Sequence, residues 1–275
     1  MSNLKIGLQL YSIRDKMEQD MDTALKKVKE AGYDYVEFAG YFDKSAQEIT
    51  AILKKYDLKC ISVHQSLDFY IEKGADGIKF IKDLGAEYSA IPWYDKEVLK
   101  NDFDATAKLF GEMGKKLSQG GLKMLYHNHD FEFDKIGDDC IIDKLYATVS
   151  PEYLNPEFDT CWVKYAGYEP TKYLEAYKGR INVVHIKDFW CKKLASGPVY
   201  ALIDKDGNPV QPESKAERGF EFRPVGSGIQ DVKAIMEASE KAGAEYVIVE
   251  QDEWYDNDSL ECAAKSRAYL KSIGY

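Results

Sequence analysis

Short apolar segments alternate along the chain with longer segments in which apolar residues recur every three or four positions. The short segments have the length and composition of buried strands, and the longer ones predict amphipathic helices. In one of these helices Met21, Leu25 and Val28 share a face. The pattern predicts eight strands, at residues 5–11, 35–40, 59–65, 88–93, 123–129, 154–160, 181–187 and 246–251.

Glycine marks the passage from helix to strand at several points, in the segments KEAGYDYVEF, KDLGAEYSAI, SQGGLKMLY and EKAGAEYVIV. Each runs from a polar helix end through a residue suited to a left-handed cap. Eight near-continuous apolar strands that alternate with helices favour a parallel sheet closed as a (β/α)₈ TIM barrel, with a doubly wound open sheet as the rival fold. No linker divides the chain, so we expect a single domain over residues 1–275.

One connection is much longer than the others. About forty residues, from Phe189 to Ile229, separate the seventh strand from its helix, whereas such loops usually need ~2–6. The turn signal Asp206-Gly207-Asn208-Pro209 lies between two alternating runs and predicts a β-hairpin. As a loop after a barrel strand, this segment should rise over the face on which barrel enzymes bind substrates.

Composition and charge narrow the function classes. The 47 acidic and 37 basic residues give a formal net charge of −10, which disfavours nucleic acid as a partner. The amino terminus lacks the pattern of a signal peptide and no window has the ~20 apolar residues of a membrane span, so we expect a cytoplasmic protein with no membrane partner. The five cysteines form no CxxC pair, which argues against a thiolate zinc site.

Polar residues recur near the carboxyl ends of the predicted strands, which all meet at one rim of a barrel. Because a polar group inside an apolar strand is costly to bury, its position there carries information. These residues are Gln9, Glu37, His64, His127, His129, Asp159, His185, Lys187 and Glu250.

The last four strands bring together His127, Asp159, His185 and Glu250. Two imidazoles and two carboxylates suit one divalent ion, with Mn²⁺ or Zn²⁺ expected first and Co²⁺, Fe²⁺ or Mg²⁺ as further candidates. A buried histidine alone is usually a hydrogen-bonded core residue, but several such residues from consecutive strands favour a functional site. Four tryptophans follow strands and could contact a sugar or merely cap the barrel core; they are Trp93, Trp162, Trp190 and Trp254.

Several motifs together resemble a known family. They are GLQLYSIRD, YVEF, YHNHDFEF, FDTCW, HIKD, PVGSG and VIVEQD. The chain resembles the xylose isomerase-like TIM barrel superfamily, and within it the sugar phosphate isomerase/epimerase group, which includes inosose dehydratase and keto-sugar epimerases.

The resemblance implies a divalent metal held by Asp159, His185 and Glu250. At the fifth strand many relatives carry a metal-binding glutamate, where this chain has His127, so either His127 replaces it or Glu132 reaches the metal. The family's epimerases move a proton between two glutamates, and the missing one favours a dehydratase or lyase as the alternative to an isomerase or epimerase.

Such a site suits proton transfer beside a ketose carbonyl through a metal-stabilised enediolate. Return of the proton gives an isomer or epimer, whereas loss of a β-hydroxyl makes the enzyme a dehydratase or lyase of an inosose or 3-keto-sugar. We expect the base to be Glu250 or His127, with Lys187 as an acid. The candidate substrate-binding residues are Glu37, His64, His129, Glu132, Trp162 and Arg223.

Two other classes fit less well. An apurinic-site endonuclease needs more histidine ligands than the four in this chain and a basic groove. A sugar-binding barrel without catalysis would show aromatic contacts and no metal. No phosphate loop is evident, since PVGSG is as well explained by a tight turn, so we expect an unphosphorylated small-molecule sugar. The long loop could also meet another subunit in a homo-oligomer.

Overall fold

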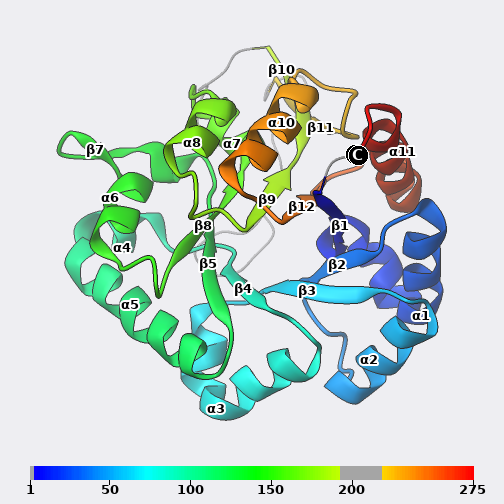
Figure 1. Cartoon of the computed structure of the whole chain (residues 1–275), viewed down its shortest axis with the longest axis horizontal. Coiled ribbons are helices and arrows are strands. Elements are labelled where there is room, and N and C mark those ends of the chain that lie inside the picture. The colour runs from blue at the N-terminus through cyan, green and yellow to red at the C-terminus, as the bar shows by residue number, and fades with distance from the viewer. Residues whose placement is uncertain (1–2, 193–218) are drawn as a thin grey trace.

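The computed structural model describes residues 3–192 and 219–275. Its strands form a closed parallel barrel in the order β1, β12, β9, β8, β5, β4, β3 and β2. The helices surround these strands (Figure 1). The closed ladder confirms the predicted (β/α)₈ barrel and excludes the open sheet. The hairpin turn predicted at residues 206–209 lies outside the described residues.

The barrel strands are β1 (Lys5–Gln9), β2 (Tyr35–Phe38), β3 (Lys59–His64), β4 (Tyr88–Ile91), β5 (Lys123–His127), β8 (Asn155–Asp159), β9 (Val183–Ile186) and β12 (Tyr246–Val249). The helices are η1 (Leu10–Ile13), α1 (Arg14–Ala31), α2 (Ala46–Lys55), α3 (Leu67–Asp83), α4 (Lys96–Asn101), α5 (Phe103–Gln119), η2 (Phe131–Phe133), α6 (Ile141–Thr148), α7 (Thr160–Tyr165), α8 (Pro170–Ala176), α10 (Val232–Ala242) and α11 (Ser259–Ser272). A short hairpin, β6 (Lys135–Ile136) with β7 (Asp139–Cys140), follows η2.

Glycine ends two of the helices as predicted. Gly32 after α1 and Gly243 after α10 adopt φ values of 96° and 95°, and each donates its N–H to carbonyls of the preceding turn. Only glycine adopts this conformation without steric cost. These two helices therefore end in left-handed caps, just before the strands that follow them.

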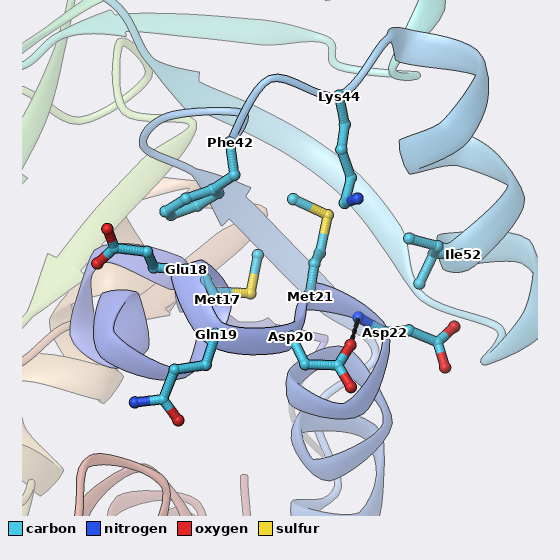
Figure 2. A pocket seen from close by; sticks show the side chains of 9 residues that line it. All are labelled: Met17, Glu18, Gln19, Asp20, Met21, Asp22, Phe42, Lys44 and Ile52. Atoms are coloured by element: carbon cyan, nitrogen blue, oxygen red, sulfur yellow. Dashed lines mark hydrogen bonds between the residues drawn. The ribbon is translucent and has the colours of Figure 1, made fainter.

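Helix α1 is interrupted near its middle. Asp20 has φ −160° and ψ 96°, and its carboxylate accepts hydrogen bonds from the backbone N–H groups of Asp22 and Thr23. This is the geometry of a helix N-cap, so the carboxylate starts a second helical segment. A small pocket at the interruption is lined by residues of α1, α2 and the loop before α2 (Figure 2).

The barrel interior is apolar below its rim. One buried cluster fills it, consisting of Ile61, Tyr88, Ala90, Leu125, Val183, Tyr246 and Ile248. The larger hydrophobic core lies between the strands and the helices. Polar side chains that point into the barrel therefore rest on an apolar floor, which shields them from water on that side.

The two ends of the long connection pair with each other. Strand β10 (Asp188–Cys191) runs antiparallel to β11 (Phe220–Arg223). The buried Asp188 carboxylate then accepts hydrogen bonds from the backbone N–H groups of Gly226, Gly228 and Gln230. The PVGSG segment is thus folded around one carboxylate at the barrel rim.

Gly228→Ala is expected to lower the free energy of unfolding by about 1–3 kcal/mol, the usual cost of overpacking. A Cβ at this position would lie 2.1 Å from Asp188 Oδ1 and 2.4 Å from the backbone oxygen of Phe189. Urea unfolding measures the loss. Gly111→Ala in α5 is the matched control, since its Cβ would meet Val149 at an ordinary 3.8 Å. Equal stability of the two variants would contradict the close packing at Gly228.

Candidate metal and catalytic site at the barrel rim

Strand register places the rim residues beside one another. His127 of β5 pairs with Glu157 of β8, and Asp159 of β8 pairs with His185 of β9. Side chains two positions apart on a strand point the same way, so Glu157 and Asp159 both face the barrel interior. The side chains of these four residues, and that of Glu250 just beyond β12, are at most 5% exposed.

Four side chains form an outer group, nearer the rim. They are His127, Asp159, His185 and Glu250, and one possible ligand atom from each lies within 4.8 Å of the others. His185 Nδ1 is 2.9 Å from Glu250 Oε2, and His127 Nε2 is 3.6 Å from Asp159 Oδ2. The structure thus brings together the four residues that the sequence nominated as metal ligands.

Asp159 is fixed by its local structure. Its Oδ1 accepts hydrogen bonds from the backbone N–H groups of Cys161 and Trp162, which caps α7. Its backbone N–H is bound in turn by Asn128 Oδ1, the residue after β5. The other oxygen, Oδ2, is buried and lies 3.1 Å from the Lys187 ammonium and 3.6 Å from His127 Nε2. The backbone contacts thus hold one oxygen and leave the other directed at the outer group.

Lys187 follows β9 and is buried among carboxylates. Its ammonium lies 3.1 Å from Asp159 Oδ2, 2.9 Å from Glu250 Oε2 and 3.0 Å from Asp252 Oδ1. Burial raises the pKa of Asp252 to about 7 despite this lysine. Because the ammonium contacts the same two oxygens that would bind a metal, it supplies positive charge where the ion would lie.

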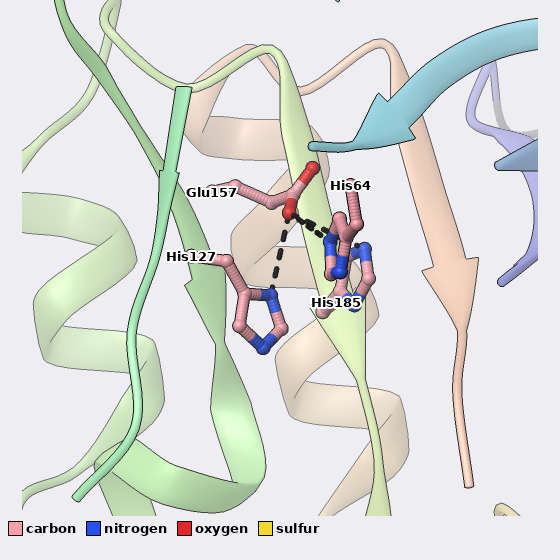
Figure 3. A group of neighbouring side chains, drawn as sticks. All are labelled: His64, His127, Glu157 and His185. Atoms are coloured by element: carbon pink, nitrogen blue, oxygen red, sulfur yellow. Dashed lines mark hydrogen bonds and ion pairs between the residues drawn. The ribbon is translucent and has the colours of Figure 1, made fainter. Parts of the chain in front are cut away.

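A second, inner group surrounds Glu157. Glu157 Oε2 is 2.9 Å from His64 Nε2, 3.3 Å from His127 Nδ1 and 3.5 Å from His185 Nε2 (Figure 3). Burial, together with the charge of Glu37, raises the pKa of Glu157 to about 7. Burial and the neighbouring histidines hold the pKa of His127 well below its usual range, so this imidazole is neutral.

Glu37 of β2 is a second carboxylate next to the inner group. Its Oε1 accepts from Gln9 Nε2 at 2.6 Å and lies 2.9 Å from His64 Nε2 and 2.8 Å from His185 Nε2. Burial alone would raise the pKa of Glu37, but the charges of His64 and His185 hold it well below the usual value. Glu37 is therefore ionised and His64, whose pKa is raised to about 10 by Glu37 against burial, carries a proton.

Other nominated residues lie apart from the two groups. Glu132 is buried after β5, where its carboxylate accepts hydrogen bonds from Tyr126 Oη and the His129 backbone N–H. It belongs to neither candidate metal group, and it orders the loop that carries His129. Arg223 on β11 pairs with Glu221 and is half exposed. The structure therefore does not bring Arg223 into the cluster.

Of the four tryptophans, only Trp162 is fully buried, and it stacks on Phe220 with centroids 5.6 Å apart. Lys187 Nζ lies 5.6 Å from its ring centroid. Trp93 and Trp190 are 51% and 41% exposed, and Trp254 packs on the Arg14 guanidinium. The predicted aromatic contacts to a sugar therefore remain a prediction, and Trp162 is the one nearest the cluster.

Glu132→Gln should gain stability relative to the wild type as pH rises. Burial raises the pKa of Glu132 from 4.5 to about 8, so the folded protein holds a proton that the unfolded chain releases across this window. Wild-type stability therefore falls as pH rises between these values, by up to about 1.4 kcal/mol per pH unit. Glutamine does not titrate and lacks this loss. Urea unfolding of both proteins from pH 5 to 8 measures the difference in their free energies of unfolding. A difference that does not change with pH would contradict the raised pKa of Glu132.

Sequence reasoning missed two carboxylates of this site. Glu157 lies two residues before Asp159, and Asp252 lies two residues after Glu250. Alternation along an extended chain was the available signal, since it points each toward the same side as the nominated neighbour. Their roles depend on partners from β3, β5 and β9, which only the folded barrel brings near.

Among the described residues, no helix is long and apolar enough to span a membrane.

The outer group fits the chemistry of a divalent ion, because it offers two imidazole nitrogens and two carboxylate oxygens from four strands, and all four side chains are buried.

Comparison with known proteins identifies the fold family. A family model described as a xylose isomerase-like TIM barrel matches residues 25–273. An inosose dehydratase of Mesomycoplasma hyopneumoniae (strain 7448) is 26% identical over 306 aligned positions, covering 99% of this chain and 97% of that protein.

Two solved structures share the fold. A sugar phosphate isomerase/epimerase from Parabacteroides distasonis has a TM-score of 0.77 at 19% identity, covering 100% of this chain and 96% of that one. The IolI protein with a bound zinc atom has a TM-score of 0.70 at 14% identity, covering 98% of each chain. The match to the family model over most of the sequence, on a closed barrel, places this chain in the xylose isomerase-like TIM barrel family.

Proposed function

We propose that this protein is a divalent-metal-dependent dehydratase of an inosose or a keto-sugar. The observation that carries the proposal is the contact between Glu250 and Lys187, 2.9 Å apart at the edge of the outer group. A carboxylate base beside an ammonium acid is the pair that an elimination of water requires. The full-length likeness to an inosose dehydratase supports the same reaction.

His127, Asp159, His185 and Glu250 would hold the metal. The mixed nitrogen and oxygen donors suit Mn²⁺ or Zn²⁺, and the zinc atom in the IolI structure supports a divalent ion on this fold. When bound, the ion would polarise the substrate carbonyl and make the neighbouring C–H more acidic.

The protein's own groups would carry the protons. Burial would raise the pKa of Glu250, but Lys187 and His185 hold it well below the usual value, so the carboxylate is ionised and ready to accept the α-proton. Lys187, placed among three carboxylates, would donate a proton to the departing β-hydroxyl, which leaves as water. One C–H and one C–O bond break, and a carbon–carbon double bond forms.

Epimerisation fits the site less well. Inversion at a carbon needs one base on each face of the substrate, and the outer group offers His127 where the related epimerases that the sequence resembles use a second glutamate. The substituted strand-five position thus disfavours the epimerase and leaves elimination the better match.

A sugar isomerase is the second candidate. An aldose–ketose exchange needs a single base that removes a proton from one carbon and returns it to the next, and Glu250 beside Lys187 supplies that arrangement. The fold is shared with a protein described as a sugar phosphate isomerase/epimerase.

An unphosphorylated substrate is supported by the PVGSG segment. The backbone N–H groups of Gly226 and Gly228, which could have bound a phosphate, donate to the Asp188 carboxylate. With these donors occupied by an acidic residue, the segment is unsuited to an anion. His64, Glu37, His129 and Trp162 remain the proposed contacts to sugar hydroxyls and ring faces.

The test is to incubate the protein with Mn²⁺ or Zn²⁺ and a panel of inososes, 3-keto-sugars and ketoses in deuterated water. The proposal expects a product that has lost water, detected by mass and by the ultraviolet absorbance of the conjugated carbonyl. Deuterium incorporation without loss of water would favour the isomerase. Neither change on any substrate, with metal demonstrably bound, would overturn both.

A further inference from the structure

Two histidines of the proposed metal site face two ways. His185 directs Nδ1 toward Glu250 at 2.9 Å and Nε2 toward the inner Glu157 at 3.5 Å. His127 directs Nε2 toward Asp159 at 3.6 Å and Nδ1 toward the same Glu157 at 3.3 Å. Each ring therefore offers one nitrogen to the outer group and the other to the inner group.

The inner group is by itself a complete set of metal ligands. His64, His127, Glu157 and His185 each present one donor atom, and these atoms lie within 4.8 Å of one another. They gather around Glu157 from four different strands (Figure 3). Three imidazole nitrogens with one carboxylate oxygen form a four-coordinate set of the kind that Zn²⁺ takes in proteins.

The inner group is also closed and incompletely satisfied. The exposed fraction of its side chains is 7% for His64, 2% for His127 and 0% for Glu157 and His185. Glu157 Oε1 is buried without a hydrogen-bond partner among the described residues, and His127 Nδ1 lies 3.3 Å from Glu157 Oε2. An unsatisfied buried polar atom is costly, and this one belongs to the carboxylate on which the ligand set is built.

The two groups cannot both use their shared histidines. A neutral imidazole has a single nitrogen lone pair, and the other nitrogen carries hydrogen. An ion in the inner group needs His127 Nδ1 and His185 Nε2 as acceptors, which turns the N–H of each ring toward the outer group. An ion in the outer group imposes the opposite tautomers, so occupation of one group excludes occupation of the other.

We propose that the barrel has a second metal position, formed by His64, His127, Glu157 and His185, which binds Zn²⁺ in competition with the outer position. Competition between the two positions rests on the proposed function of the outer group, whereas zinc binding by the inner group does not. The inner set has more nitrogen donors and suits Zn²⁺, whereas the outer set, richer in carboxylate, suits Mn²⁺.

The protein would therefore bind Zn²⁺ in the inner group and Mn²⁺ in the outer group. Zinc in the inner group lies on the apolar floor formed by residues such as Leu125 and Tyr88, and it has four protein ligands. Zn²⁺ usually takes four ligands, so zinc held by four protein side chains has no open position for a substrate, as in structural zinc sites, whereas Mn²⁺ in the outer group is commonly octahedral and keeps open positions. Inner zinc would therefore withdraw both histidines from the outer group and exclude the divalent ion that the proposed reaction would use.

The test measures affinities of the metal-free full chain for Zn²⁺ and Mn²⁺ separately by calorimetry. His64→Ala removes an inner ligand and no outer one, so it should weaken Zn²⁺ binding by about 10–100-fold or more and leave Mn²⁺ binding within a few-fold. Asp159→Asn is the matched opposite, and should weaken Mn²⁺ binding by a similar factor while Zn²⁺ binding stays within a few-fold. Zn²⁺ should also displace bound Mn²⁺, followed by the release of its free-ion electron paramagnetic resonance signal.

The outcome that would overturn the proposal is a common response. If Asp159→Asn weakens the binding of both ions and His64→Ala weakens the binding of neither, Zn²⁺ binds only at the outer group. His64→Asn, which keeps a polar side chain, repeats the test, and circular dichroism of each metal-free variant shows that it is folded. Because no substrate is used, failure here is separate from failure of the proposed dehydration, which the product assay alone decides.

Discussion

Glu250→Gln is expected to lower turnover by roughly 10²–10⁴-fold, the usual contribution of a general base. The substitution removes the negative charge that accepts the α-proton, and it also removes one of the four outer ligand atoms. Turnover at saturating metal is the measurement, with solvent deuterium incorporation as the report on proton removal. Metal affinity should fall in the same variant.

The control for Glu250 is the glutamate at the other end of the same strand. Glu245 precedes β12 at the opposite end of the barrel, where it pairs with Lys5 on the surface. Glu245→Gln makes the same chemical change far from the rim and should leave turnover within about twofold of the wild type. Retention of full activity by Glu250→Gln would remove this residue from the mechanism.

Lys187→Met should separate metal binding from catalysis, because it is expected to strengthen the first and weaken the second. The ammonium contacts Asp159 Oδ2 and Glu250 Oε2, the two oxygens that a metal would bind, so its removal ends a competition between like charges. Metal affinity should rise by about tenfold or more, equivalent to about 1.4 kcal/mol. Turnover should fall by roughly 10²–10⁴-fold, because the acid is lost.

The same substitution should also destabilise the metal-free protein. Removing one partner of a buried ion pair costs about 3–5 kcal/mol, and here Asp252 loses its contact with the ammonium. Urea unfolding with and without Mn²⁺ measures this, and the metal should recover more stability in the variant than in the wild type. Lys164→Met, which breaks the partly exposed pair with Glu169, serves as the control. Unchanged or weaker metal binding by Lys187→Met would contradict the competition.

Much of the fold was predictable because it follows from local rules. Gly32 and Gly243 marked helix ends and so predicted where the next strands begin, and near-continuous apolar strands indicated a parallel barrel. The strands are shorter than predicted at their carboxyl ends. His129 and Lys187 lie beyond β5 and β9, because the chain leaves the ladder where the polar rim begins.

The outer group could be predicted because all strands of a parallel barrel end at one rim. A single rule therefore brought His127, Asp159, His185 and Glu250 together before their distances were known. The inner group could not be predicted in the same way. Glu157 lies within an apolar strand, and its three histidine partners come from β3, β5 and β9 at distances in sequence that no local pattern relates.

Ring orientation also lies beyond sequence reasoning. Which nitrogen of His127 or His185 faces which group depends on side-chain torsions, and these are set by the packing of the whole rim. The surroundings of Arg223 are likewise set by the folded chain, because β11 pairs with β10 and the Arg223 side chain pairs with Glu221.

The most direct test of the account is a crystal of the protein grown with Mn²⁺ and measured at a wavelength where manganese scatters anomalously. The account predicts one strong anomalous peak among His127 Nε2, Asp159 Oδ2, His185 Nδ1 and Glu250 Oε2, with Lys187 displaced toward Asp252. A map without a peak between these four atoms, at a manganese concentration that supports turnover, would contradict it.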